Sequence, residues 1–138
     1  MSQIKTHAIR FHQNGGPEVL QWEELVLPDP GAGEARVRHH ACGLNFLDVY
    51  QRSGLYKMAL PSGLGSEGAG VVEAVGAGVR GVKPGERVSG EGHLIGMKSR
   101  MARAGHFHLD PETKGIGINL PGAFAEYVAL PYAETNLV

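Results

Sequence analysis

The chain has 138 residues, 42% of them hydrophobic, and a formal net charge of -1, which predicts one globular domain without the basic surface of a nucleic-acid-binding protein. No apolar run approaches the roughly 20 residues of a membrane-spanning helix, and residues 1–7 lack the apolar core of a secretory signal. The single cysteine, Cys42, excludes an internal disulfide, and we expect a cytoplasmic domain that binds neither nucleic acid nor membrane.

The 21 glycines and 8 prolines are spread along the chain, which is typical of a β fold with many turns and bulges. We therefore predict about seven short strands. They are expected at residues 6–11, 19–27, 34–41, 68–75, 86–89 and 122–130, with a possible hairpin extension at 79–82 and a last strand beginning at 136.

The strand predicted at 34–41 alternates, with Ala35, Val37, His39 and Ala41 on one face and charged or imidazole side chains on the other. This period-2 pattern predicts a half-buried antiparallel strand. His39 fits a partly buried strand histidine better than a metal ligand.

Residues 45–52 lack the alternating pattern of a strand and predict one short helix with Asn45 as its N-cap, ending near Gly54. The apolar residues of this segment leave Asp48 and Gln51 on the opposite side.

Residues 90–120 are rich in Lys, Arg, His and Gly and predict a protruding lobe. His106 and His108 share a face of an extended segment, but surface histidines are the better interpretation than a metal site. The elements together predict a mainly β fold over one domain, 1–138: a partly open antiparallel β-barrel with one short helix and the lobe.

The stretch 61–88 twice fits the pattern G-x-G-x-x-G, at Gly63 and at Gly76. That dinucleotide fingerprint requires a helix directly after the glycines. A strand pattern follows the first match, and Pro84 follows the second. Neither match is therefore expected to bind a nucleotide; we predict strands around a tight glycine turn.

The first 88 residues closely resemble the quinone oxidoreductases, which are zinc-independent members of the medium-chain dehydrogenase/reductase superfamily. The resemblance lies in residues 15–20, 43–50, 52–56 and 60–65. It implies a GroES-like β-barrel.

From residue 87 on, the chain instead resembles threonine dehydrogenase, in residues 87–93, 103–105, 108–109 and 122–127. That resemblance implies a lobe with four cysteines on a structural zinc. The four positions are occupied here by Gly96, Ser99, Ala102 and Asp110, so no structural zinc is expected. The two resemblances suggest a chimera, with a natural member that combines both features as the alternative.

The zinc-dependent relatives also hold a catalytic zinc, and the resemblance places their cysteine at Asn45 and their histidine at Ser66. We therefore expect no metal. Cys42 lies outside the ligand position and is expected to be a small buried residue at a strand end. Glu67 is expected to satisfy backbone donors near the hairpin.

The resemblance implies hydride transfer from NADPH to a quinone or another activated carbonyl. It implies cofactor contacts for Asn45 and Asp48 and substrate contacts for Tyr50 and Tyr56. The structural alternatives are a helix cap for Asn45, a solvated face for Asp48 and a core position for Tyr50.

The superfamily binds its cofactor on a Rossmann domain, and these 138 residues show no βαβ pattern. The expectation is an isolated substrate-side domain that has no catalytic residue and binds no cofactor alone, and that meets a quinone or carbonyl only when a Rossmann domain is supplied. The alternative is a GroES-like binding or scaffold module that forms homo-oligomers through the exposed apolar face.

Overall fold

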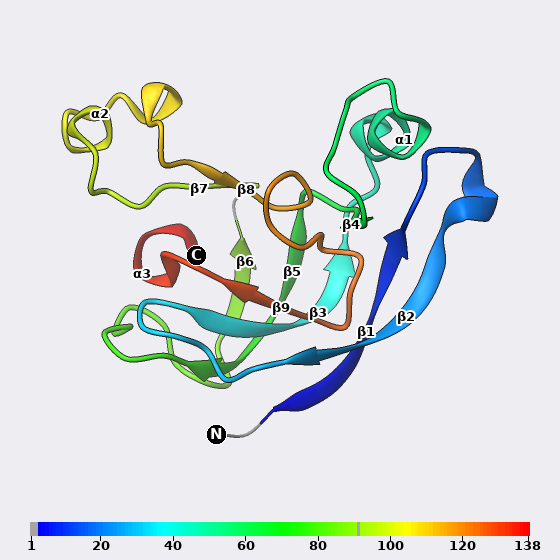
Figure 1. Ribbon diagram of the computed structural model, residues 1–138. Coiled ribbons are helices and arrows are strands. Elements are labelled where there is room, and N and C mark those ends of the chain that lie inside the picture. The colour runs from blue at the N-terminus through cyan, green and yellow to red at the C-terminus, as the bar shows by residue number, and fades with distance from the viewer. Residues whose placement is uncertain (1–2, 91) are drawn as a thin grey trace.

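The computed structural model describes residues 3–90 and 92–138, and antiparallel strands dominate them (Figure 1). The strands are β1 (Ile4–Phe11), β2 (Gln21–Leu27), β3 (Ala35–Cys42), β4 (Ser62–Gly63), β5 (Gly68–Val75), β6 (Arg87–Gly90), β7 (His93–Leu94), β8 (Lys114–Gly115) and β9 (Tyr127–Leu130). The helices are α1 (Phe46–Ser53), α2 (Arg100–Arg103) and α3 (Ala133–Asn136), with 3-10 turns at Pro17–Val19 and Phe107–Leu109.

Two sheets make the barrel. One has the strand order β2-β1-β4, and the other has the order β6-β5-β3-β9. The pair β7-β8 forms a small separate sheet in the lobe, and among the described residues all paired strands are antiparallel. The predicted mainly β, antiparallel fold is confirmed.

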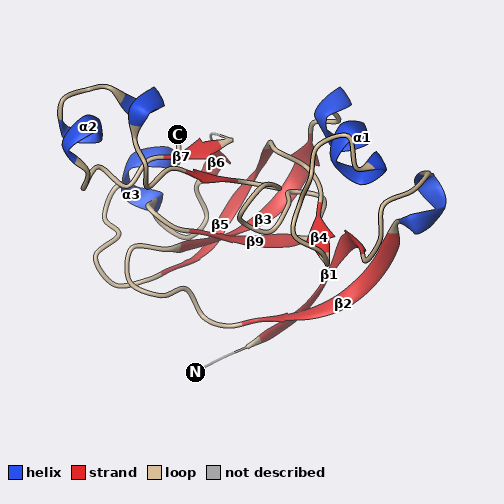
Figure 2. Cartoon of the chain, turned by 45° about the horizontal axis from the view of Figure 1, so that its top comes forward, coloured by secondary structure: helices blue, strands red, loops and turns tan. Residues whose placement is uncertain are grey.

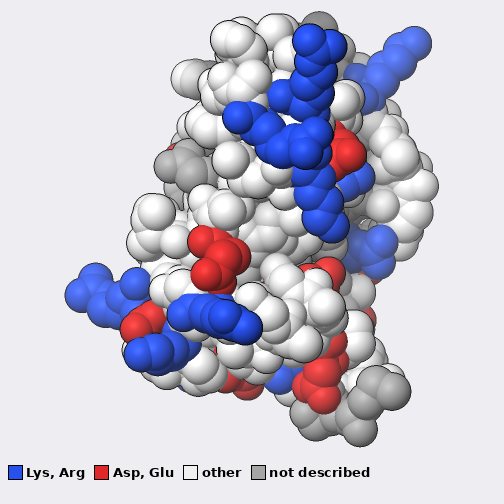
Figure 3. All heavy atoms as spheres, turned by 90° about the vertical axis from the view of Figure 1, so that its left-hand side faces the viewer, with Lys and Arg blue, Asp and Glu red and all other residues white. Residues whose placement is uncertain are grey.

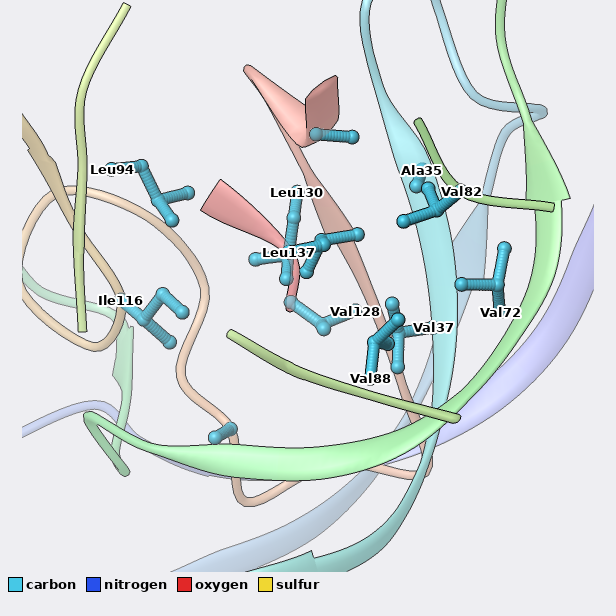
Figure 4. Packing of buried hydrophobic residues seen from close by; sticks show 12 residues of the cluster. Ala35, Val37, Val72, Val82, Val88, Leu94, Ile116, Val128, Leu130 and Leu137 are labelled. Atoms are coloured by element: carbon cyan, nitrogen blue, oxygen red, sulfur yellow. The ribbon is translucent and has the colours of Figure 1, made fainter. Parts of the chain in front are cut away.

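The main core lies between the four-stranded sheet and the segments that close over it (Figure 4). Val37, Val72 and Val128 are each at most 2% exposed and come from three neighbouring strands. Leu94 and Ile116 bring the base of the lobe into the same cluster. The lobe is therefore anchored in the barrel core, although its outer part projects as predicted.

The alternation predicted for residues 34–41 is only partly correct. Arg36 is 4% exposed although it was placed on the outer face, and Ala41 is exposed. Irregular register at Arg36/Val37 and His39/Ala41 shifts the side chains of β3 relative to β5. Glu73 pairs with the Arg36 guanidinium, which also donates to the Pro28 carbonyl, so the buried charge is compensated.

Two predicted strands were wrong. Residues 79–82 form a loop, because Arg80 N and Gly81 N donate to the Glu134 carboxylate, at 2.6 and 2.8 Å, instead of to a strand. Helix α3 ends where a strand was expected to begin, and only the last two residues extend alongside β6, where Ser89 and Val138 exchange backbone hydrogen bonds. The strand predicted at 122–130 is regular only in β9.

Helix α1 and the lobe lie apart at two corners of the molecule (Figures 1 and 2). Lys and Arg side chains gather at the end of the face where the lobe lies (Figure 3). The lobe's basic residues Lys98, Arg100, Arg103 and Lys114 are all exposed.

Candidate functional site

The N-terminus of α1 is fixed by a capping box between Asn45 and Asp48. The Asp48 carboxylate accepts from Asn45 N at 2.7 Å. At the other end, Gly54 adopts a left-handed conformation with φ 85, and its N–H closes the last turn on the Gln51 carbonyl. The predicted helix, its N-cap and its end are confirmed.

The faces of α1 are the reverse of what an amphipathic surface helix shows. Asp48 and Gln51 are 2% and 3% exposed, whereas Phe46 is 79% exposed and Tyr50 37%. The structural alternatives of a solvated Asp48 and a core Tyr50 were therefore wrong. The reason is that Asp48 also accepts from Gly65 N, at 3.1 Å, so its carboxylate turns inward to join the helix to the glycine turn.

The glycine turn requires glycine. Gly65 has φ +95, and a Cβ on it would lie 2.9 Å from the backbone nitrogen of Phe124. Residue Gly68 begins β5 directly afterwards, and no helix follows Gly81. The prediction that strands surround a tight turn here is confirmed.

The outward side of α1 and the loop after it form an exposed apolar surface, which we call the aromatic face. Its members are Leu44, Phe46, Val49, Tyr50, Leu55 and Tyr56, each between 37% and 80% exposed. Phe46 stacks near Tyr50, with ring centroids 6.3 Å apart, and Tyr50 meets Tyr56 edge-on at 5.6 Å. A row of rings open to solvent suits a planar apolar partner.

Polar groups border this face at the start of α1. The Asn45 amide donates to the Glu67 carboxylate at 3.2 Å. This side-chain contact replaces the backbone donors that were expected for Glu67, and it leaves the partly exposed Asn45 beside the exposed Glu67.

The four predicted site residues therefore fall into two groups. Asn45, Tyr50 and Tyr56 are accessible around α1, whereas Asp48 is buried with its oxygens on two backbone donors. The geometry gives Asp48 a positioning role, and the ligand contacts of all four stay predictions. Sequence reasoning did not include Phe46 in the site, although its place one residue after the cap was a usable signal.

Cys42 was expected to be buried but is exposed, because it ends β3 beyond the core. Its Sγ–H donates to the Ala123 carbonyl at 2.9 Å, and partial burial raises the pKa of the thiol. The residues described contain no group of three or more His, Cys, Asp or Glu side chains placed to hold a metal ion. The donor set at Asn45 and Ser66 likewise does not fit a catalytic zinc.

Two of the lobe positions that the resemblance aligns with zinc ligands make hydrogen bonds within the lobe. Ser99 Oγ caps α2 by accepting from Ala102 N at 3.0 Å, and Asp110 Oδ1 accepts from Glu112 N at 3.1 Å. The exposed imidazoles of His106 and His108 meet edge-on at 6.2 Å.

A cavity of about 470 Å³ lies between β1, β2, β9 and the segment before β9. None of the four predicted site residues lines it. In the part of the chain that the structure describes, no helix is long and apolar enough to span a membrane.

These features define a small barrel domain that presents an aromatic face on one appendage and basic side chains on the other, the lobe. Residues 31–138 match the family described as the alcohol dehydrogenase GroES-like domain, and the chain belongs to this family. It is the GroES-like domain of the medium-chain dehydrogenase/reductase superfamily.

Quinone oxidoreductase 1 of Escherichia coli strain K12 is 54% identical over 81 residues, 58% of this chain and 25% of that protein. The L-threonine 3-dehydrogenase of Ruegeria pomeroyi is 41% identical over 120 residues, 83% of this chain and 35% of that protein. The crystal structure of an NAD-dependent alcohol dehydrogenase superposes with a TM-score of 0.86 at 42% identity, over 96% of this chain and 38% of that one. The chain thus spans about a quarter to two fifths of the proteins it matches. The chimeric origin stays a prediction.

Proposed function

We propose that this chain is the substrate-side domain of an NADPH-dependent oxidoreductase that acts on quinones or other activated carbonyls. The observation that carries the proposal is the reversed helix α1, which buries Asp48 and Gln51 and exposes its aromatic residues. Because the burial of Asp48 and Gln51 turns the aromatic rings of α1 toward solvent, we expect these rings to contact a ligand or a partner.

The aromatic face fits one wall of a cleft for planar rings. Tyr50 and Tyr56 offer ring surface and hydroxyl donors, and the Asn45 amide offers a donor or acceptor to a carbonyl or to a nicotinamide. The reduced nicotinamide supplies the hydride when it is bound. The residues of this chain would orient the acceptor and exclude water.

The described sheets are antiparallel and contain no βαβ unit. We therefore expect the 138 residues by themselves to be catalytically silent. Turnover of NADPH with a simple quinone, clearly above a heat-killed control, would overturn that expectation.

Binding tests the aromatic face directly. We expect duroquinone, whose substituted ring resists attack by the exposed Cys42 thiol, to shift the amide resonances of α1 in an NMR titration. The double variant Tyr50→Leu/Tyr56→Leu keeps the apolar surface but should weaken binding by at least about tenfold.

Trp22→Leu is the matched control, because Trp22 is a 56% exposed aromatic residue on β2, away from α1. Binding should be unchanged in it. Resonance shifts scattered over the surface, or equal loss in both variants, would count against the proposed cleft.

Self-association is a second candidate function, favoured by Leu44, Phe46 and Leu55, which are each at least 67% exposed. A scaffold module would form homo-oligomers through this face. Size-exclusion chromatography separates the two: a dimer that Phe46→Ser returns to a monomer supports the scaffold, and a monomer in both cases rejects it.

A further inference from the structure

Another pocket, of about 640 Å³, lies where the lobe meets α3, and we call it the lobe pocket. Ile95, Met97 and Phe107 line it from the lobe, and Thr135 and Asn136 line it from α3. None of the residues assigned to the cleft around α1 is among its lining residues. The lobe pocket is therefore separate from the site described above.

A buried carboxylate oxygen without a partner belongs to this pocket. Asp110 is one of the lining residues and is 7% exposed, so its carboxylate lies at the bottom of the pocket and not at its rim. Oδ1 accepts from Glu112 N at 3.1 Å. Oδ2 is the one buried side-chain nitrogen or oxygen atom among the described residues that has no hydrogen-bond partner. A buried ionised oxygen without a donor is unfavourable, so we expect a donor from outside the chain.

The walls of the lobe pocket are held in place by the protein itself. Asn136 accepts from Ile95 N at 2.8 Å and donates to the Ile95 carbonyl at 2.9 Å. On the opposite wall, Thr113 N donates to the Asp110 carbonyl at 3.3 Å. Met97 has a left-handed backbone with φ 58, which is unfavourable for a residue other than glycine. Backbone strain of this kind is concentrated at ligand sites, and here it lies in the same pocket as the unpartnered oxygen.

The chemistry of Asp110 selects the class of ligand. An ionised carboxylate only accepts hydrogen bonds, so the ligand must donate, and a positively charged donor also neutralises the buried charge. A metal ion does not fit, because the described residues contain no group of three or more His, Cys, Asp or Glu side chains placed to hold one. An ammonium group carries several donors, and the Thr113 hydroxyl and the neutral His93 imidazole line the pocket as further acceptors.

The rest of the ligand is expected to be short and apolar, because Ile95, Met97 and Phe107 line the pocket around the carboxylate. Met97 and Phe107 are 38% and 47% exposed, so their side chains can move apart and admit an ammonium group to the buried oxygen. The face of the Phe107 ring also attracts a cation. The basic side chains of the lobe are exposed, and salt screens their repulsion beyond about 8 Å at physiological ionic strength.

We propose that the lobe pocket binds the primary ammonium group of a small alkylamine, with Asp110 as the residue that accepts its hydrogen bonds and balances its charge. The hydrocarbon chain of the amine lies against Ile95, Met97 and Phe107. This site does not depend on the proposed quinone cleft around α1, so either one can fail without the other.

An NMR titration of the 138-residue chain with pentylamine, which is protonated at about pH 7, tests the proposal. The amide resonances of Met97 and Thr113 should shift and reach saturation, while those of α1 should stay in place. Pentanol has the same hydrocarbon chain with a neutral hydroxyl in place of the ammonium group. It should bind at least about tenfold more weakly, because hydrogen bonds between two charged groups are the stronger ones.

Asp110→Asn removes the charge but keeps a side-chain oxygen that can accept from Glu112 N, and it should weaken pentylamine binding at least about tenfold. Glu112→Gln is the matched control, because it removes one negative charge from the exposed neighbour, and it should bind pentylamine as the wild-type chain does. Equal loss in both variants, equal binding of pentylamine and pentanol, or shifts confined to residues outside the lobe overturn the proposal.

If Asp110→Asn does not fold, the carboxyl carbon resonance of Asp110 in the wild-type chain decides. A shift of this resonance that follows the amide shifts during the pentylamine titration supports the proposal. A resonance that stays in place while the amine is added overturns it.

Discussion

Helix α1 and the lobe are attached to the barrel in the same way but present opposite surfaces. In α1 the buried carboxylate of Asp48 accepts from backbone N–H groups. The lobe is held from α3, where the buried Asn136 amide accepts from Ile95 N at 2.8 Å and donates to the Ile95 carbonyl at 2.9 Å. Outward, α1 shows aromatic rings, whereas the lobe shows basic side chains around α2.

This difference is the reason that we propose α1, and not the lobe, as the appendage that binds the quinone or carbonyl acceptor. An exposed aromatic side chain such as Phe46 lowers the solubility of the protein, whereas an exposed lysine does not. The lobe is held to the barrel by ordinary protein contacts: Asn136 hydrogen-bonds to Ile95, and Leu94 and Ile116 bury the base of the lobe in the core. Four substitutions test this comparison.

The largest effect is expected from Asp48→Ala. It leaves the N–H groups of Asn45 and Gly65 without their acceptor, and we expect the free energy of unfolding to fall by about 4 kcal/mol. Urea denaturation measures the change. Val49→Ala, on the exposed side of the same helix, should stay within about 0.5 kcal/mol. A loss below about 1 kcal/mol for Asp48→Ala would mean that the helix is not anchored by this carboxylate.

Gly65→Ala should cost about 3 kcal/mol, because it combines a left-handed backbone with a close approach to Phe124 N. Gly78→Ala isolates the first contribution, since Gly78 has φ +86 and open space around it, and it should cost about 1 kcal/mol. Thermal unfolding of the pair gives the difference. Equal costs would remove the argument for a close approach.

Asn136→Ala should cost about 2 kcal/mol, less than Asp48→Ala, because neutral hydrogen bonds are weaker than those to a carboxylate. Hydrogen exchange should show faster opening in the lobe than in β3 and β5. Thr135→Val is the control: Thr135 is exposed and contacts the same Ile95 carbonyl only through its hydroxyl, so the change should be small. Uniform loss of protection across the barrel would show that the lobe is no separate unit.

The smallest effect is expected from Glu134→Gln. Hydrogen bonds from Arg80 N and then Gly81 N lower the pKa of Glu134, so its contribution is present above about pH 4.5 and lost as the pH falls through the folded pKa. The variant should reduce the acid dependence of exchange at those two amides while leaving α1 and the lobe unchanged. An identical acid dependence in both proteins would contradict this role.

Sequence reasoning found what local chemistry determines. Alternation and glycine punctuation predicted β5 with its observed bounds, and Asn45 with Gly54 predicted both ends of α1. It failed where a residue far away in the sequence determines whether a side chain is buried. The carboxylate of Asp48 turns inward because it accepts from Gly65, 17 residues later in the chain, and Arg36 is buried because Glu73 on the neighbouring strand β5 pairs with it.

Tyr50 and Tyr56 were singled out through family resemblance, whereas Phe46 and the reversal of the helix were not predicted. An apolar pattern alone states that one side of α1 differs from the other. It does not state which side meets the barrel, because that depends on Gly65 and its neighbours.

The close approach of the Gly117 and Gly65 backbones limits which lobes could replace the lobe of this domain. Gly117 has φ +70, and a Cβ there would lie 2.6 Å from the Gly65 oxygen, so the lobe meets the glycine turn main chain against main chain. A lobe recombined from a relative can be accepted only when it carries glycine at this position. In a library of grafted lobes, this one residue should therefore separate the folded members from the rest.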